Sequence, residues 1–287
     1  MHTPTLLPTE VLDLLAVHGE QVTHGIQITA RKWASAKAAY RVVLPDGRQL
    51  KARVLLESVS AEGLLLLRES VGYRNGFASV IAGSGRCLLE EWVTGEPLDG
   101  PFPPPGVAET CGRILAQLHR SRMPDLTAPT TRVADELALC RSRLGAIERA
   151  GWLTPREAND LVSLAESSAP ARTEVGIIHL DYCGENIVLH PEKGPVCIDN
   201  ETMQIGSVDL DLARSLRRWP LAPPARGDFL RGYSWAGGPA DASSLPFWGL
   251  MAEALSAEIR LRYDNPRIDA PVTALRTMLA LARAEKP

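Results

Sequence analysis

The chain has 287 residues, 45% hydrophobic and 23% charged, an ordinary composition for a globular protein that can bury one or two cores. Its 31 Lys and Arg and 34 Asp and Glu give a net charge of -3, with Arg spread along the chain, so no nucleic-acid partner is expected. The five cysteines are widely spaced without a metal-ligand pattern, which favours reduced thiols in a cytoplasmic protein. No signal peptide or membrane span is predicted, and we expect a monomer or a homodimer.

Two hairpins and one helix are predicted in the first third of the chain. After an amphipathic opening segment, strand-like runs at residues 40–44 and 48–56 flank a Pro-Asp-Gly turn. Residues 58–71 read as a helix with Ser58 or Ser60 as its N-cap, and residues 77–93 as a second hairpin that turns at residues 83–85. This order predicts an antiparallel sheet with one inserted helix.

A segment rich in Pro and Gly, residues 94–106, interrupts the pattern and is the predicted boundary between two lobes, residues 1–93 and 94–287. Beyond it, the hydrophobic periodicity becomes helical, and a loose Pro/Gly/Ala region follows from about residue 220 to 246. The predicted fold is therefore α+β and bilobal, with a small sheet-containing first lobe and a larger, mostly helical second lobe. The helical stretches are residues 107–120, 133–150, 155–168 and 246–262.

Polar side chains gather between and after two strand-like runs, residues 175–181 and 194–200. Phosphoryl transfer needs oxygen ligands for Mg²⁺ and an acceptor for the proton of the incoming hydroxyl. In this interpretation Asp181 orients the hydroxyl and accepts its proton, while Asn186 and Asp199 bind Mg²⁺. Each residue alone fits an ordinary turn or cap. Together they favour catalysis.

The motif HLDYCGEN, residues 179–186, resembles the H-G-D-x-x-x-x-N loop of the aminoglycoside phosphotransferase and choline kinase superfamily. The segment IDNE, residues 198–201, resembles the I-D-x-E strand of that superfamily, and RILAQLH resembles its L-A-x-L-H helix. The segment GSVDLDLA resembles its G-D-P-x-x-D-L-A motif, which makes Asp211 the carboxylate that supports the catalytic loop. The resemblance implies a kinase-like fold, ATP or GTP as donor with Mg²⁺, and a small hydroxyl-bearing acceptor.

In the first lobe the resemblance makes Lys51 the phosphate-binding lysine. A lysine that lies along the surface of the sheet is the alternative. The expected ion-pair partner of Lys51 is Glu62, with Glu69 as the second possibility. Leu180 replaces the glycine that commonly follows the histidine of the loop, which affects the local backbone conformation.

The adenine site implied by the resemblance is the segment LLEEWVTG, where the backbone C=O of Glu91 and N–H of Val93 would bind the base. The expected nucleotide loop lies near residues 31–42 and has no glycine. Ser35 and neighbouring alanines are small enough for the backbone to approach phosphate.

Three other polar residues have roles that the sequence leaves more open. His179 and His119 are expected to brace the backbone. Glu201 could contact the acceptor or a second metal ion, or pair with an arginine.

The expected function is transfer of the γ-phosphate of ATP or GTP to a small molecule, with an aminoglycoside-type or other antibiotic first, in resistance or self-protection. A metabolic kinase of choline, a sugar or an amino acid is the alternative. The rapid succession of arginines after residue 213 disfavours a strongly cationic acceptor. Two further hypotheses are a catalytically inactive nucleotide-binding module and a metal-dependent hydrolase with His179 and Asp181 as ligands.

Overall fold

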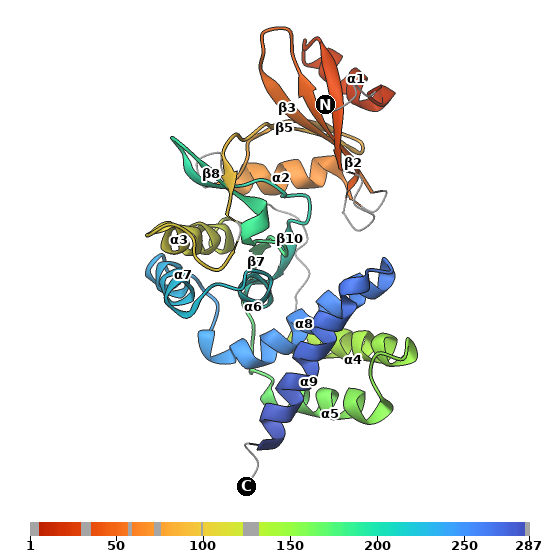
Figure 1. Cartoon of the computed structure of the whole chain (residues 1–287), viewed down its shortest axis with the longest axis vertical. Coiled ribbons are helices and arrows are strands. Elements are labelled where there is room, and N and C mark those ends of the chain that lie inside the picture. The colour runs from red at the N-terminus through yellow and green to blue at the C-terminus, as the bar shows by residue number, and fades with distance from the viewer. Residues whose placement is uncertain are drawn as a thin grey trace.

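The computed structural model describes residues 6–29, 36–56, 59–71, 76–98, 100–122 and 132–284. Its N-terminal part is a five-stranded antiparallel sheet in the order β1-β2-β3-β5-β4, with one helix on each face (Figure 1). The strands are β1 (His24–Thr29), β2 (Ala36–Val43), β3 (Gln49–Leu55), β4 (Val80–Ser84) and β5 (Cys87–Glu91), and the helices are α1 (Thr9–Val17) and α2 (Ala61–Val71).

The local sequence explains how these elements begin and turn. Asp46 accepts a hydrogen bond from the backbone N–H of Arg48, and Gly47 takes a φ of 85°, so the turn between β2 and β3 closes where it is predicted. The second hairpin turns at Gly85 and the residue after it, slightly later than expected. Of the two candidate caps of α2, Ser60 accepts a hydrogen bond from the N–H of Gly63, while Ser58 lies outside the described residues.

The C-terminal part is mostly helical and also contains two short sheets, of order β10-β7 and β6-β8-β9. Its helices are α3 (Val107–His119), α4 (Val133–Arg149), α5 (Pro155–Ser168), α6 (Val208–Arg218), α7 (Pro223–Trp235), α8 (Leu245–Arg262) and α9 (Asp269–Ala284). Its strands are β6 (Glu96–Pro97), β7 (Val175–Ile178), β8 (Ile187–His190), β9 (Gly194–Cys197) and β10 (Gln204–Ser207). The predicted α+β fold of two lobes is confirmed. No helix in the described ranges combines the length and apolar character needed to cross a bilayer.

Three hydrophobic cores formed by the described residues hold these elements together. One joins α1 to the sheet, and another joins α4, α5, α8 and α9. The third extends from α2 through α3 and α7 to the segment between β7 and β8, so it runs continuously from the first lobe into the second. The helix α7 corrects the expectation of a loose region after residue 220. Pro223 and Pro224 occupy its first turn, where the missing N–H of proline costs nothing.

Helices α3 and α7 pack at very short distance because each has a glycine at the contact. A Cβ on Gly112 of α3 would lie 2.0 Å from the carbonyl oxygen of Phe229, and a Cβ on Gly232 of α7 would lie 2.0 Å from that of Glu109. Both oxygens belong to the backbone, so no side-chain rotation could relieve the clash with an added Cβ. The two glycines therefore fix the spacing of the helices that support the site.

We expect Gly112→Ala to lower the free energy of unfolding by about 1–3 kcal/mol, although alanine is the better helix former by about 1 kcal/mol. Gly227→Ala in α7 is the matched control, because a Cβ there meets nothing within 4 Å. That control should leave stability unchanged or raise it slightly. Urea unfolding of both variants measures the difference, and equal stabilities would contradict the close contact.

Candidate active site

The loop from His179 to Asn186 between β7 and β8 is held by one buried carboxylate. Asp211 on α6 accepts hydrogen bonds from the backbone N–H of His179 at 2.8 Å and of Leu180 at 2.6 Å. His119 at the end of α3 lies 3.0 Å from the same carboxylate, and its other ring nitrogen contacts the hydroxyl of Tyr233 at 2.7 Å. Asp211 thus ties the loop to three helices, and His119 has a bracing contact.

Leu180 adopts a left-handed backbone conformation with a φ of 62°. This conformation costs a residue other than glycine about 1–2 kcal/mol. Its N–H is bound by Asp211 and its C=O accepts a hydrogen bond from Nε of Arg214, so both polar backbone groups are fixed by α6. The replacement of glycine by leucine therefore keeps the backbone geometry that a glycine would adopt easily.

His179 is fully buried, and both of its ring nitrogens are engaged. Nδ1 accepts a hydrogen bond from the backbone N–H of Asp181 at 3.2 Å, so the proton resides on Nε2, which lies 3.1 Å from the side-chain oxygen of Asn200. Burial lowers the pKa of His179. A neutral imidazole with both nitrogens hydrogen-bonded braces the loop. Its only lone pair, on Nδ1, already accepts a hydrogen bond and is not available to a metal ion, which removes the basis for the hydrolase hypothesis.

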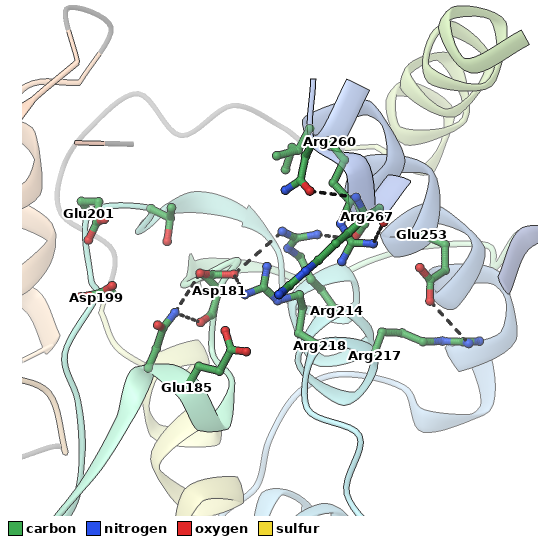
Figure 2. A pocket seen from close by; sticks show the side chains of 15 residues that line it. Asp181, Glu185, Asp199, Glu201, Arg214, Arg217, Arg218, Glu253, Arg260 and Arg267 are labelled. Atoms are coloured by element: carbon green, nitrogen blue, oxygen red, sulfur yellow. Dashed lines mark hydrogen bonds and ion pairs between the residues drawn. The ribbon is translucent and has the colours of Figure 1, made fainter. Parts of the chain in front are cut away.

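Asp181 lies at the centre of the site, between an amide and two guanidinium groups (Figure 2). Its Oδ2 accepts a hydrogen bond from Nδ2 of Asn186 at 2.8 Å, and the same amide nitrogen also binds the backbone C=O of Asp181 at 2.9 Å. Its Oδ1 lies 3.1 Å from Arg218 and 4.0 Å from Arg214. The Asp181 carboxylate is therefore oriented from both sides while 26% of it stays exposed.

Asp199 connects this loop to the sheet of the first lobe. Its Oδ1 binds Nζ of Lys51 at 2.5 Å and Nη2 of Arg53 at 2.6 Å. Arg53 is buried, and it also contacts Glu90 of β5 at 2.8 Å and Glu201 at 3.0 Å. One arginine thus pairs with three carboxylates from two segments of the chain, β5 and the residues after β9.

The charges of this network set the ionisation of its carboxylates. Burial alone would raise the pKa of Asp199, but Arg53 and Lys51 outweigh burial and hold it below its usual value. Burial raises the pKa of Glu201, and the nearby charge of Asp199 adds to that effect. Of the roles left open for Glu201, the structure forms the arginine pair, although Glu201 also reaches the edge of the pocket described below.

The oxygens that could hold Mg²⁺ face one pocket. Asn186 uses its amide nitrogen toward Asp181, and its Oδ1 has no donor among the described residues. Asp199 uses Oδ1 for its two cations, while Oδ2 makes no hydrogen bond within the described ranges. An amide oxygen and a carboxylate oxygen, with the rest of the shell left to water and phosphate, suit Mg²⁺. The donor set of this protein therefore fits the expected ion.

Neither of the two glutamates expected to pair with Lys51 contacts it. Glu62 does not reach Lys51, because its carboxylate binds the hydroxyl of Ser60 and the N–H of Gly85 instead. Glu69 is exposed on α2, where the inward position next to it is occupied by Arg68. The expected Glu62 pair is therefore wrong in this structure, and Glu90 of β5 supplies the carboxylate beside β3.

Glu91 and Val93 lie at and just after the end of β5, and Ser35 lies outside the described residues. The side chain of Glu91 binds Lys193 and the N–H of Ser79, and its own N–H binds the C=O of Ser79. The N–H of Val93 has no backbone acceptor within the described segments. This leaves the N–H of Val93 open to a ligand, and the C=O of Glu91 stays the predicted acceptor beside it.

A cavity of about 310 Å³ extends from Asp199 past Asp181 into the second lobe. Its wall there is formed by α6, α8 and the turn after α8, and it is rich in arginine (Figure 2). The arginines that line it are Arg214, Arg217, Arg218, Arg260 and Arg267. The site thus combines the oriented Asp181 carboxylate, two oxygens whose chemistry fits Mg²⁺, and a lysine paired with Asp199. The arginine-lined part of the cavity in the second lobe is a second compartment of the same pocket.

Residues 58–245 match the family model described as "Phosphotransferase enzyme family", abbreviated APH. The matched region spans well over half of the sequence and includes the loop from His179 to Asn186 and the segment from Ile198 to Glu201. The protein belongs to the APH phosphotransferase enzyme family. No curated protein sequence matches it.

Several solved structures share the fold at low sequence identity. Choline kinase LicA from Streptococcus pneumoniae has a TM-score of 0.70 at 14% identity, and the match covers 93% of this protein and 96% of the kinase. A macrolide 2'-phosphotransferase type I has a TM-score of 0.68 at 16% identity, with coverages of 94% and 98%. A putative fructosamine-3-kinase from Thermobifida fusca has a TM-score of 0.65 at 20% identity, with coverages of 96% and 97%. These likenesses show the kinase-like fold and no particular acceptor.

Sequence reasoning missed the residues that complete the site by long-range contact. Arg53 is two residues after Lys51 on the same face of β3, which is a usable signal, but its partners Glu90 and Glu201 are far away in the sequence. Arg214 and Arg218 follow Asp211 by three and seven residues, so helical periodicity places them on the same side of α6. No motif or spacing in the sequence indicated Arg260 or Arg267 as residues of the site.

We expect Arg53→Met to lower the free energy of unfolding by about 3–5 kcal/mol, because it leaves buried carboxylates without their cation. Lys51→Met should cost about 1 kcal/mol or less, since the Asp199 partner is partly exposed. Urea denaturation compares the two variants. A similar loss in both would mean that Arg53 does not carry the network.

Stability should fall in acid because of His179. A histidine with a lowered folded-state pKa contributes full stability above its unfolded pKa of about 6.5, and the contribution is lost as the pH falls, by up to about 1.4 kcal/mol per unit. We expect a shallower decline between pH 7 and pH 5 in His179→Gln than in the unmodified protein. His18→Gln, at an exposed position, is the control for the unfolding measurements. Parallel declines in all three proteins would contradict the buried neutral state.

Proposed function

We propose that this phosphotransferase moves the γ-phosphate of ATP or GTP, with Mg²⁺, to a hydroxyl of a small molecule. The observation that carries the proposal is the convergence of Asp181, Asn186 and Asp199 on one pocket. An inactive binding module would have no use for a carboxylate that is oriented on both sides and still exposed. The five cysteines are free and buried, which supports the reducing cytoplasm as the location.

Each of these residues has a task that follows from its contacts. The Asp181 carboxylate, fixed by Asn186 and Arg218, accepts a hydrogen bond from the acceptor hydroxyl and then its proton. Asn186 and Asp199 would hold Mg²⁺, which neutralises charge on the phosphates when bound. Lys51 pairs with the Asp199 carboxylate, whereas Arg53 is held by three carboxylates. Lys51 is therefore the cation that can turn to a phosphate oxygen.

The adenine or guanine base would lie against the segment after β5. The C=O of Glu91 and the N–H of Val93 would supply one acceptor and one donor to the edge of the base. This pairing uses backbone groups, so it is compatible with the side-chain contacts of Glu91 to Lys193 and Ser79. Glu62 has no part in this arrangement.

The acceptor is the least constrained component. Likeness to the macrolide phosphotransferase supports an antibiotic, and likeness to the choline kinase supports a metabolite, but at these identities both rest on fold alone. The lining of the second compartment is more specific, because a polycationic aminoglycoside would face several arginines. The pocket therefore argues against an aminoglycoside and leaves neutral or anionic hydroxyl compounds.

Three substitutions test the roles. Asp181→Asn should lower kcat by about 10²–10⁴-fold, because an amide does not accept the proton, while Mg²⁺-nucleotide binding persists.

Asp199→Asn should lose both Mg²⁺-dependent nucleotide binding and turnover, and Arg53 should keep the fold through its two remaining carboxylates. Lys51→Met should weaken nucleotide binding. Calorimetric titration with Mg²⁺ and nucleotide, together with ADP or GDP release over a panel of hydroxyl compounds, measures these effects.

Glu192→Gln is the control, because this carboxylate is exposed in the turn between β8 and β9. It should behave as the unmodified protein. Unchanged turnover in Asp181→Asn would overturn the assignment of the base. Nucleotide binding without any turnover in the unmodified protein, over the whole panel, would favour the binding module.

A further inference from the structure

The second compartment of the pocket has a charge pattern that the phosphotransfer chemistry does not require. Figure 2 shows Asp199 and Glu201 on one side of Asp181, and the arginines of α6, α8 and the following turn on the other. The donor nucleotide would lie on the first side, where Lys51 and the metal oxygens are. The arginines on the second side are therefore placed where an acceptor would bind.

The carboxylates near these arginines do not neutralise all of them. Arg218 pairs with Asp181 at 3.1 Å, and Arg217 pairs with Glu253 at 3.7 Å. Within the described part of the sequence, neither Arg260 nor Arg267 has a carboxylate within 4.0 Å. Two guanidinium groups thus line the pocket without an ion-pair partner, although Glu253 and Asp269 lie near enough to Arg260 to offset part of its charge.

These two arginines are held near each other by backbone contacts. Nη1 of Arg260 donates to the C=O of Arg267 at 2.7 Å, and the side chain of Asn265 accepts a hydrogen bond from the N–H of Arg267 at 3.0 Å. Burial and the neighbouring positive charge of Arg218 lower the pKa of Arg260. Like charges gathered in this way are costly for the folded protein unless a ligand supplies the opposite charge.

We propose that the acceptor is an anionic hydroxyl compound, with a carboxylate or phosphate group bound by Arg260 and Arg267 while its hydroxyl points to Asp181. This inference rests on the proposed phosphotransfer and names the substrate class of the same site. A guanidinium offers two parallel N–H donors to either kind of anion. Arg218 adjoins both Asp181 and Arg260, so a small molecule can reach from one to the other.

The test uses matched compounds that differ in charge. One series is glucosamine, glucose, gluconate and glucose 6-phosphate, and the other is glycerol, glycerate and glycerol 3-phosphate. Binding is measured by calorimetry at fixed ionic strength, with Mg²⁺ and a non-hydrolysable ATP analogue present, so that the nucleotide-phosphate site is already filled. Turnover is followed as ADP release with ATP. The carboxylate and phosphate members of each series distinguish the two kinds of anion.

We expect at least one anionic member to bind at least about tenfold more tightly than its neutral counterpart, and glucosamine to bind more weakly than glucose. Arg260→Gln and Arg267→Gln should each remove most of that preference. Arg262→Gln is the matched control, because Arg262 lies on the same helix, is exposed and pairs with Glu258 at 3.0 Å. It should keep the preference.

Two results would overturn the inference. One is binding of glucosamine as tight as that of the anions, and the other is the absence of any anion binding that depends on Arg260 or Arg267. Binding of the ATP analogue is measured in the same samples. If the analogue binds and the anion preference is absent, only the acceptor class is wrong. If the analogue and Mg²⁺ do not bind, the proposed phosphotransferase mechanism itself fails.

Discussion

The arrangement of the two lobes depends on the ion pairs that the buried guanidinium of Arg53 forms with three carboxylates. Arg53 comes from β3 in the first lobe and pairs with Glu90 of β5, and with Asp199 and Glu201, which follow β9 in the second. Burying these charges is costly for each of them alone, so the cost is offset only when all are together. The segment that follows β9 is therefore held against the sheet by electrostatics, and Asp199 keeps a defined place relative to Lys51.

The catalytic loop depends on a second buried charge, Asp211, which binds two backbone N–H groups of the loop. The histidine and tyrosine behind it come from helices that the paired glycines bring close. A series of contacts thus leads from helix spacing to the position of Asp181. This explains how a site made of short polar segments is kept rigid by a mainly apolar lobe.

The sequence was informative where chemistry is local and poor where it depends on distant partners. Asp181, Asn186 and Asp211 were predicted because fixed spacings within short motifs place them, and the lobes because hydrophobic periodicity changes at the Pro-rich segment. Glu62 was misassigned because a helix can rotate to present another side chain, here Arg68. Arg53 and Glu90 were missed because their contact depends on the register of β3 with β5. Arg260 and Arg267 were missed because only the folded α8 and the turn after it bring them to the pocket.

Helix α6 bears Asp211, Arg214 and Arg218 along one side, so one rigid element positions the loop, fixes the strained Leu180 and charges the pocket. Each helical residue adds a rotation of about 100°. A single residue inserted between Asp211 and Arg214 would leave Asp211 bound to the loop but turn both arginines away, which would remove the hydrogen bond from Arg214 to the Leu180 C=O and two positive charges of the pocket. A shift in helical phase of α6 would therefore change the charge beside Asp181 without altering any residue from His179 to Asn186.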